Sequence, residues 1–172
     1  LDFSAQPLAG ATLDDLDINQ LVRLRRIIQT RQGGEKTLLT LSDEDLERAL
    51  RLTTEVGERY VPTVTGMLLL GKEERIAELM PTAKSSFQVL EGTAVRMNEE
   101  SSKPLLELFE NYETYLKAWN PEKEMEYGLF RIPIPEFDWS AFREALVNAF
   151  CHRDYTMLGC VRVLIDDEGL AI

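Results

Sequence analysis

Apolar residues recur at helical spacing in six stretches of the chain, and polar residues that can cap a helix precede several of them. Asp17, Ser42 and either Asp138 or Ser140 are the expected N-caps. The pattern predicts helices at about 18–32, from 42, at 64–70, at 73–80, from 104 to 119 and from about 139. Gly33-Gly34 is the expected end of the first helix.

Alternating apolar and polar residues predict strands between these helices. The predicted strands are 85–90, 127–132, 161–166 and a return strand that starts at 170. We expect a turn or short hairpin at 57–63 and a loop at 98–103. This order of elements predicts an α+β fold, with several helices packed on a small mixed or antiparallel sheet.

The densest cluster of polar side chains lies in the last helix and in the turn after it. Glu144 and Asn148 are four residues apart and therefore neighbours on one helix face, and His152, the single histidine, continues their row. A second face carries an apolar stripe expected to be buried: Phe142, Ala145, Leu146, Ala149 and Phe150. An acid, an amide and a histidine are thus predicted to lie within about three helical turns.

Charge and cysteine content narrow the classes of function. The chain has 19 Lys and Arg against 30 Asp and Glu, a net charge of −11, which opposes non-specific binding to nucleic acid or to an anionic membrane. Cys151 and Cys160 fit neither a metal-binding spacing nor a disulfide framework, so reduced thiols and a cytoplasmic location are expected. No apolar run reaches the roughly 20 residues of a membrane span. The first residues, Leu1-Asp-Phe-Ser, lead us to expect a piece of a longer chain.

Glu144 and Asn148 suit metal-assisted attack of water on a nucleotide phosphate. A carboxylate can orient and deprotonate water, and an amide oxygen one turn away can bind Mg²⁺. The spacing alone is weak support, because E-x-x-x-N is common by chance. For His152-Arg153-Asp154, the residues alone favour a capping and ion-pair network that fixes the turn after the helix.

Three other interpretations do not fit the residues in detail: a phosphate-binding loop, a protein kinase and a winged-helix module. The segment Gly66–Lys72 resembles a phosphate-binding loop, but Glu73 stands where the magnesium-binding hydroxyl belongs, and four large apolar residues favour a buried helix. His152-Arg153-Asp154 lacks the asparagine and the glycine-rich loop of a protein kinase. A helix followed by a hairpin would fit a winged-helix DNA-binding module, but a basic recognition helix is missing.

Two segments resemble a prokaryotic family. Arg143-Glu-Ala-Leu-Val-Asn-Ala-Phe-Cys-His-Arg-Asp-Tyr155 resembles the most specific motif of proteins described as RecG-like ATP-dependent DNA helicases, or as transcriptional regulators with a Schlafen-type AlbA domain. Thr65–Gly71 resembles the family's T-x-A-G-L-L-L-F-G segment, with Thr65 in place of Ala and Leu70 in place of Phe. The resemblance covers about 42–172.

The resemblance implies the first half of a gyrase/Hsp90/histidine-kinase-type ATPase fold, incomplete in this chain. Glu144 then matches the water-activating acid and Asn148 the magnesium ligand, with ATP and Mg²⁺ as cofactors of the full-length protein. His152, Arg153 and Asp154 match the family's own H-R-D. The implied division is a connector and helix at 1–35, a helical segment with one strand at 36–92, and the N-terminal half of the ATPase-like domain at 93–172, with 36–172 able to pack as one unit.

The resemblance leaves three hypotheses for the function. One is a DNA-linked transcriptional regulator with an ATPase-like nucleotide-binding module, which binds DNA through domains outside this chain and associates into homo-oligomers. The second is a degenerate ATPase-like scaffold for domain packing or oligomerisation without catalysis, and the third is the winged-helix module. The motifs for adenine and for a phosphate lid are not visible before Ile172, so we expect this chain alone to bind ATP weakly or not at all.

Overall fold

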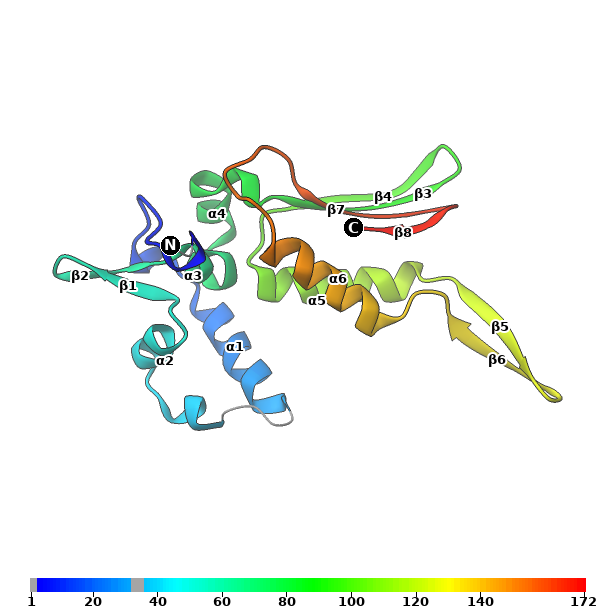
Figure 1. Cartoon of the computed structure of the whole chain (residues 1–172), viewed down its shortest axis with the longest axis horizontal. Coiled ribbons are helices and arrows are strands. Elements are labelled where there is room, and N and C mark those ends of the chain that lie inside the picture. Colours follow the sequence, from blue (N-terminus) through cyan, green and yellow to red (C-terminus); the bar gives the residue numbers. More distant parts are fainter. Residues whose placement is uncertain (1–2, 32–35) are drawn as a thin grey trace. The chain divides into compact units, whose positions relative to one another are not determined.

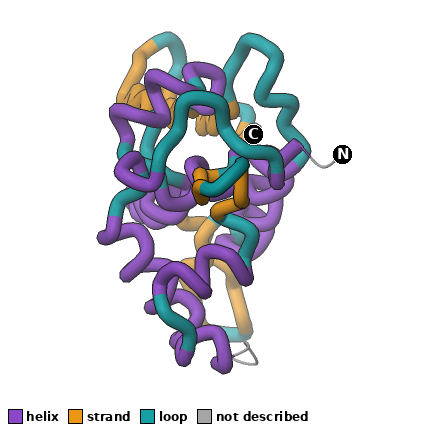
Figure 2. The backbone as a smooth tube through the Cα atoms, turned by 90° about the vertical axis from the view of Figure 1, so that its left-hand side faces the viewer, coloured by secondary structure: helices purple, strands orange, loops and turns teal. Residues whose placement is uncertain are grey.

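A computed structural model describes residues 3–31 and 36–172 as an α+β fold with two compact units (Figure 1). The first unit is Leu1–Ala83 with Ser102–Phe109, and the second is Lys84–Ser101 with Glu110–Ile172. The α+β class predicted from the sequence is therefore confirmed. Figure 2 distinguishes the helices, strands and loops of the backbone by colour.

The described residues of the first unit form four α-helices, short 3-10 helices, one hairpin and the first residues of a fifth α-helix. Its elements are α1 (Ile18–Thr30), α2 (Asp43–Ala49), β1 (Thr53–Val56), β2 (Arg59–Pro62), α3 (Val64–Leu70), α4 (Glu73–Leu79) and the start of α5 (Leu105–Trp119). Its buried core contains Leu21, Leu46, Leu52 and Leu70. The turn or short hairpin predicted at 57–63 is part of the longer hairpin β1–β2, whose first strand was not predicted, and helix α3 has the predicted bounds.

Side chains cap these helices as predicted. Asp17 accepts a hydrogen bond from the Asn19 amide at the start of α1, and Ser42 accepts one from the Asp45 amide at the start of α2. Helix α1 ends at Thr30, and the predicted glycine stop, Gly33-Gly34, lies outside the described residues.

Two arginines of α1, Arg23 and Arg25, form ion pairs with acids of the same unit. Arg25 contacts Asp43 at 2.6 Å and donates to the Leu41 carbonyl oxygen at 2.9 Å, which holds α1 against the start of α2. Arg23 pairs with Glu107 at 3.3 Å. These pairs support an ion-paired α1 rather than a free basic face.

Gly66 explains why α3 is a packed helix and not a phosphate loop. A Cβ atom at this position would lie 1.9 Å from the Leu52 carbonyl oxygen, so only glycine permits this approach of the backbones. Most of α3 is buried: Val64, Gly66, Met67, Leu68 and Leu70. The Lys72 ammonium donates to the Asp14 carbonyl oxygen at 2.7 Å and is thereby engaged within the unit.

The second unit is built on a four-stranded mixed sheet in the order β4-β3-β7-β8. Its strands are β3 (Ser85–Glu91), β4 (Ala94–Ser101), β7 (Val161–Asp166) and β8 (Gly169–Ala171). Strands β3 and β7 are parallel, with Phe87 opposite Val163, and the other neighbours are antiparallel. The Phe87 ring packs edge-on against Tyr112 and Tyr115 of α5, at centroid distances of 5.2 and 5.4 Å.

Two sequence predictions about strands were wrong. The expected loop at 98–103 is strand as far as Ser101, because β4 is a polar edge strand held by its ladder with β3 rather than by apolar burial. The single strand expected at 127–132 is a hairpin of β5 (Glu122–Tyr127) and β6 (Phe130–Pro135), which turns at Gly128, where φ is 62°.

The base of this hairpin joins α5 to α6 (Trp139–Cys151). The Asn120 side chain donates to the Phe137 carbonyl oxygen at 2.7 Å and accepts from the Phe137 amide at 2.9 Å. Asp138 then accepts a hydrogen bond from the Ala141 amide at 2.9 Å and caps α6. The fold thereby fixes where the helix with the predicted site residues begins.

Candidate functional site

Helix α6 presents one buried face and one polar face. Phe142, Leu146 and Phe150 are buried at i, i+4 and i+8, and the Trp139 ring lies 5.6 Å from Phe142. The predicted buried stripe is narrower than expected, because Ala145 is exposed and Ala149 is only partly buried. The other face of the helix is left to solvent.

Glu144 and Asn148 lie on that exposed face and line one shallow pocket of about 320 Å³. Among the residues that the structure describes, neither side chain makes a hydrogen bond or an ion pair. Both oxygen-bearing side chains therefore lie together in this pocket and are exposed to solvent.

Three residues that the sequence analysis did not name as site residues complete this pocket: Ser140, Arg143 and Val147. They belong to the same helical row as Glu144 and Asn148, since the five positions fall at i, i+3, i+4, i+7 and i+8. Extending the row toward the N-terminus would have found them. Arg143 adds a positive charge beside the two oxygen donors.

The His152-Arg153-Asp154 run lies at a second hollow, of about 520 Å³, which α6 residues share with the segment up to β7. His152 is the C-cap of α6, and its backbone N–H donates to the Asn148 carbonyl oxygen at 3.0 Å. Its side chain is exposed and does not line the pocket of Glu144 and Asn148. The row predicted along α6 is therefore divided between two hollows.

The turn after α6 is held by internal hydrogen bonds. Asp154 accepts from both the amide and the hydroxyl of Thr156, at 2.9 and 2.6 Å, and Arg153 donates to the Gly159 carbonyl oxygen at 2.5 Å. The hydrogen bonds from Thr156 lower the pKa of the Asp154 carboxyl. The residues alone predicted a capping and ion-pair network at this turn; these contacts are hydrogen bonds to the backbone and to Thr156, and they do not include the His152 side chain.

Tyr155 completes this turn. Its hydroxyl donates to the Phe150 carbonyl oxygen at 3.0 Å, and burial raises the pKa of Tyr155 to about 12. The Arg153 guanidinium lies 5.6 Å from the Tyr155 ring, within cation–π range. Tyr155 therefore acts as a structural anchor between the turn and the last turn of α6.

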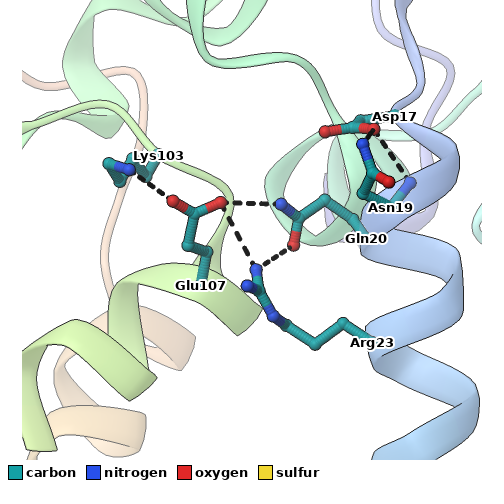
Figure 3. A network of polar contacts seen from close by, with 6 residues as sticks. All are labelled: Asp17, Asn19, Gln20, Arg23, Lys103 and Glu107. Carbon is teal, nitrogen blue, oxygen red and sulfur yellow. Dashed lines mark hydrogen bonds and ion pairs between the residues drawn. The ribbon is translucent and has the colours of Figure 1, made fainter.

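The first unit contains a further polar cluster, shown in Figure 3. Glu107 accepts hydrogen bonds from Gln20 at 2.8 Å, from Arg23 at 3.3 Å and from Lys103, and Arg23 also donates to Gln20 at 2.8 Å. The hydrogen bond from Lys103, followed by those from Gln20 and Arg23, lowers the pKa of the Glu107 carboxyl despite its partial burial. The hydrogen bonds from Gln20 and Arg23 to Glu107 hold the 102–109 segment against α1.

A comparison of sequences places the chain in a family. The sequence pattern of a family described as "Domain of unknown function (DUF8451)" matches residues 1–86. The chain belongs to the DUF8451 family. No curated protein matches it.

One similar solved structure is the crystal structure of the DIP2311 protein from Corynebacterium diphtheriae, a Northeast Structural Genomics Consortium target. It is 24% identical, has a TM-score of 0.71 and aligns with 98% of this chain. The chain spans about a third of that structure, since the alignment covers 31% of it. The likeness shows a shared fold for this DUF8451 member.

Two further features bear on ligands and location. No group of three or more His, Cys, Asp or Glu side chains that could hold a metal ion occurs in residues 3–31 and 36–172. No helix within those residues is long and apolar enough to cross a lipid bilayer. Cys151 and Cys160 are free cysteines.

Proposed function

We propose that this chain supplies the magnesium and water-activating side of an ATPase-like module in a DNA-linked transcriptional regulator. The observation that carries the proposal is the shared pocket of Glu144 and Asn148, whose side chains are exposed and unpaired within the described part of the chain. Because both side chains are free of hydrogen bonds and ion pairs there, they are accessible to a ligand.

The donor set of the pocket fits Mg²⁺ bound together with a nucleotide. Mg²⁺ prefers oxygen ligands, keeps several waters and takes further ligands from phosphates, so Asn148 would supply one protein oxygen and the nucleotide phosphates and waters would supply the others. Bound there, Mg²⁺ would neutralise phosphate charge. Glu144 would accept the proton of the attacking water, and Arg143 would hold a phosphate oxygen.

The family resemblance supplies the remaining parts of the proposal. The adenine-binding part and the phosphate lid would follow Ile172, and DNA would be bound by domains outside this chain. The chain alone would then bind ATP weakly or not at all. A cytoplasmic location belongs to the same proposal and is supported by the free thiols Cys151 and Cys160.

A degenerate scaffold is the second candidate, and the turn after α6 favours it. Arg153, Asp154 and Tyr155 are engaged in internal contacts, so this part of the specific motif already has a structural role. Under this alternative the motif preserves the α6–β7 connection and no nucleotide binds. The winged-helix alternative lacks such support, because Arg23 and Arg25 of α1 are paired with acids.

Calorimetric titration with Mg·ATP distinguishes the two candidates. The protein should include the residues that follow Ile172, and Asn148→Ala should be compared with Asn111→Ala on helix α5 as a matched control. We expect binding that weakens at least about tenfold in Asn148→Ala and stays unchanged in the control. A folded protein that binds no Mg·ATP would contradict the proposal and leave the scaffold.

A further inference from the structure

The β5–β6 hairpin has one apolar face and one charged face. The ladder places Met125 opposite Ile132 and Tyr127 opposite Phe130. Because cross-strand partners lie on the same face and successive residues alternate, these four side chains share a face with Lys123 and Ile134. The opposite face carries Glu122, Glu124, Glu126, Arg131, Pro133 and Pro135.

The apolar face is open to solvent. Tyr127 and Phe130 are each 73% exposed, Met125 is 52% exposed, and Leu129 at the tip is fully exposed. An isolated two-stranded hairpin is marginally stable in water, and a contiguous exposed apolar patch marks an interaction surface. This face therefore requires a partner surface that packs against it.

The edges of the hairpin do not offer a site for strand addition. Pro133 and Pro135 remove two N–H groups from β6, which blunts that edge. On β5, pairing with a second copy would align the glutamate row, headed by Glu122, with itself, and like charges opposite each other are destabilising. With strand addition disfavoured at both edges, packing through the apolar face is the mode of association that the hairpin permits.

The charges of the hairpin argue against nucleic acid and anionic lipid as the partner. Arg131 contacts Glu124 and Glu126, at 3.3 and 3.6 Å, and Lys123 pairs with Glu136, so both cations are already neutralised. The chain as a whole has a net charge of −11. A polyanion would be repelled by this surface.

A second copy of this chain fits the same surface. If two apolar faces pack about a two-fold axis, the glutamate rows point away from each other into water, and the apolar side chains of the two copies cover one another. The exposed fractions of Met125, Tyr127, Leu129, Phe130 and Ile132 amount to on the order of 700 Å² per copy, which is the upper limit of what these side chains can bury. A standard protein interface buries roughly 800 Å² per partner, so this surface suits a weak, reversible dimer.

We infer that this chain self-associates by packing the apolar faces of two β5–β6 hairpins against each other. The inference depends on neither ATP nor Mg²⁺, so it stands or falls separately from the proposed nucleotide site. It assigns the interaction surface to Met125, Tyr127, Leu129, Phe130 and Ile132.

Sedimentation analysis of the chain over a range of protein concentrations tests the inference. We expect a reversible dimer whose dissociation constant rises at least about tenfold in the double variant Tyr127→Ser/Phe130→Ser. The matched control, Glu124→Ser/Glu126→Ser, places the same residue on the charged face and should leave the dimer intact. A wild-type chain that stays monomeric, or a dimer that the apolar-face variant does not weaken, would overturn the inference.

A photo-crosslinking experiment on otherwise unaltered protein guards against misfolding of the double variant. Benzoylphenylalanine in place of Leu129, a fully exposed side chain, should join two copies through residues of the partner hairpin. The same group in place of Glu124, on the charged face, should not. Cross-links within one copy, or to surfaces other than the partner hairpin, would show that something other than a second hairpin packs against this face. Such a result would refute self-association through it.

Discussion

Glu107 and Glu144 are glutamates on two helices of one chain, and their surroundings differ in kind. Glu107 accepts hydrogen bonds from Gln20, Arg23 and Lys103, and its side chain is 25% exposed. Glu144 is exposed and, within the described residues, has no hydrogen-bonding partner. Glu107 is therefore a carboxylate that helps to hold the fold together, whereas Glu144 is a carboxylate that a ligand can reach. Both belong to clusters of polar side chains on a helix.

The largest expected effect separates the two carboxylates directly. Glu107→Ala should lower the free energy of unfolding by about 2–3 kcal/mol, because the buried Gln20 amide and two cations lose their common acceptor. Glu144→Ala should change it by less than about 0.5 kcal/mol. Urea unfolding of the two variants measures both changes in the free energy of unfolding. Equal losses would show that the contacts of Glu107 stabilise the fold no more than the exposed side chain of Glu144 does.

A smaller effect is expected at Tyr112, whose buried hydroxyl donates to the Ser85 hydroxyl at 2.9 Å. Tyr112→Phe leaves the fully buried Ser85 without this partner and should cost about 1–2 kcal/mol. Tyr115→Phe is the control, because Tyr115 contacts the same Phe87 ring through its own ring. An equal loss of stability in the two variants would show that the hydroxyl pair contributes nothing of its own.

The pH dependence of stability gives a third comparison. The pKa of Glu107 is lowered from its ordinary value of 4.5, so its contribution is present above that value and is lost as the pH falls through the folded-state pKa. The difference in unfolding free energy between wild type and Glu107→Ala should therefore be largest near neutral pH and shrink below about pH 4.5. A difference that grows on acidification would contradict the assignment of the pKa direction.

The smallest effect is local and concerns the turn after α6. Asp154→Ala removes the acceptor of the Thr156 amide and should speed hydrogen exchange at that amide while leaving the midpoint of global unfolding nearly unchanged. Exchange measured by NMR at Thr156, with the Ala141 amide as an internal reference, tests it. Unchanged exchange at Thr156 would show that Asp154 does not hold the turn.

The sequence was sufficient for elements in which local signals agree. The bounds of α3 follow from four consecutive large apolar residues ended by Gly71, and the start of α6 follows from the Asp138 cap. The edge strand β4 and strand β5 were missed, because their residues are mostly polar and exposed and the alternation of apolar and polar residues that identifies a strand extends over only part of each.

The candidate site was likewise predicted in part from the sequence. Spacing on α6 was enough to place Glu144 and Asn148 together, and the structure brings both to one pocket. It was not enough to place His152, because the helix ends there and the chain turns toward a different hollow. Nor could spacing reveal the partners of Glu107, since Gln20 lies 87 residues away in the sequence.

Thermal unfolding with and without Mg·ATP tests the central claim most directly, in the protein extended past Ile172. We predict that wild type and Asn148→Ala unfold at the same temperature without ligand, because Asn148 has no structural role, and that Mg·ATP raises the unfolding temperature of wild type alone. Two results would contradict the account. One is an Asn148→Ala variant that unfolds at a lower temperature than wild type without ligand, and the other is a variant whose unfolding temperature rises as much with Mg·ATP as that of wild type.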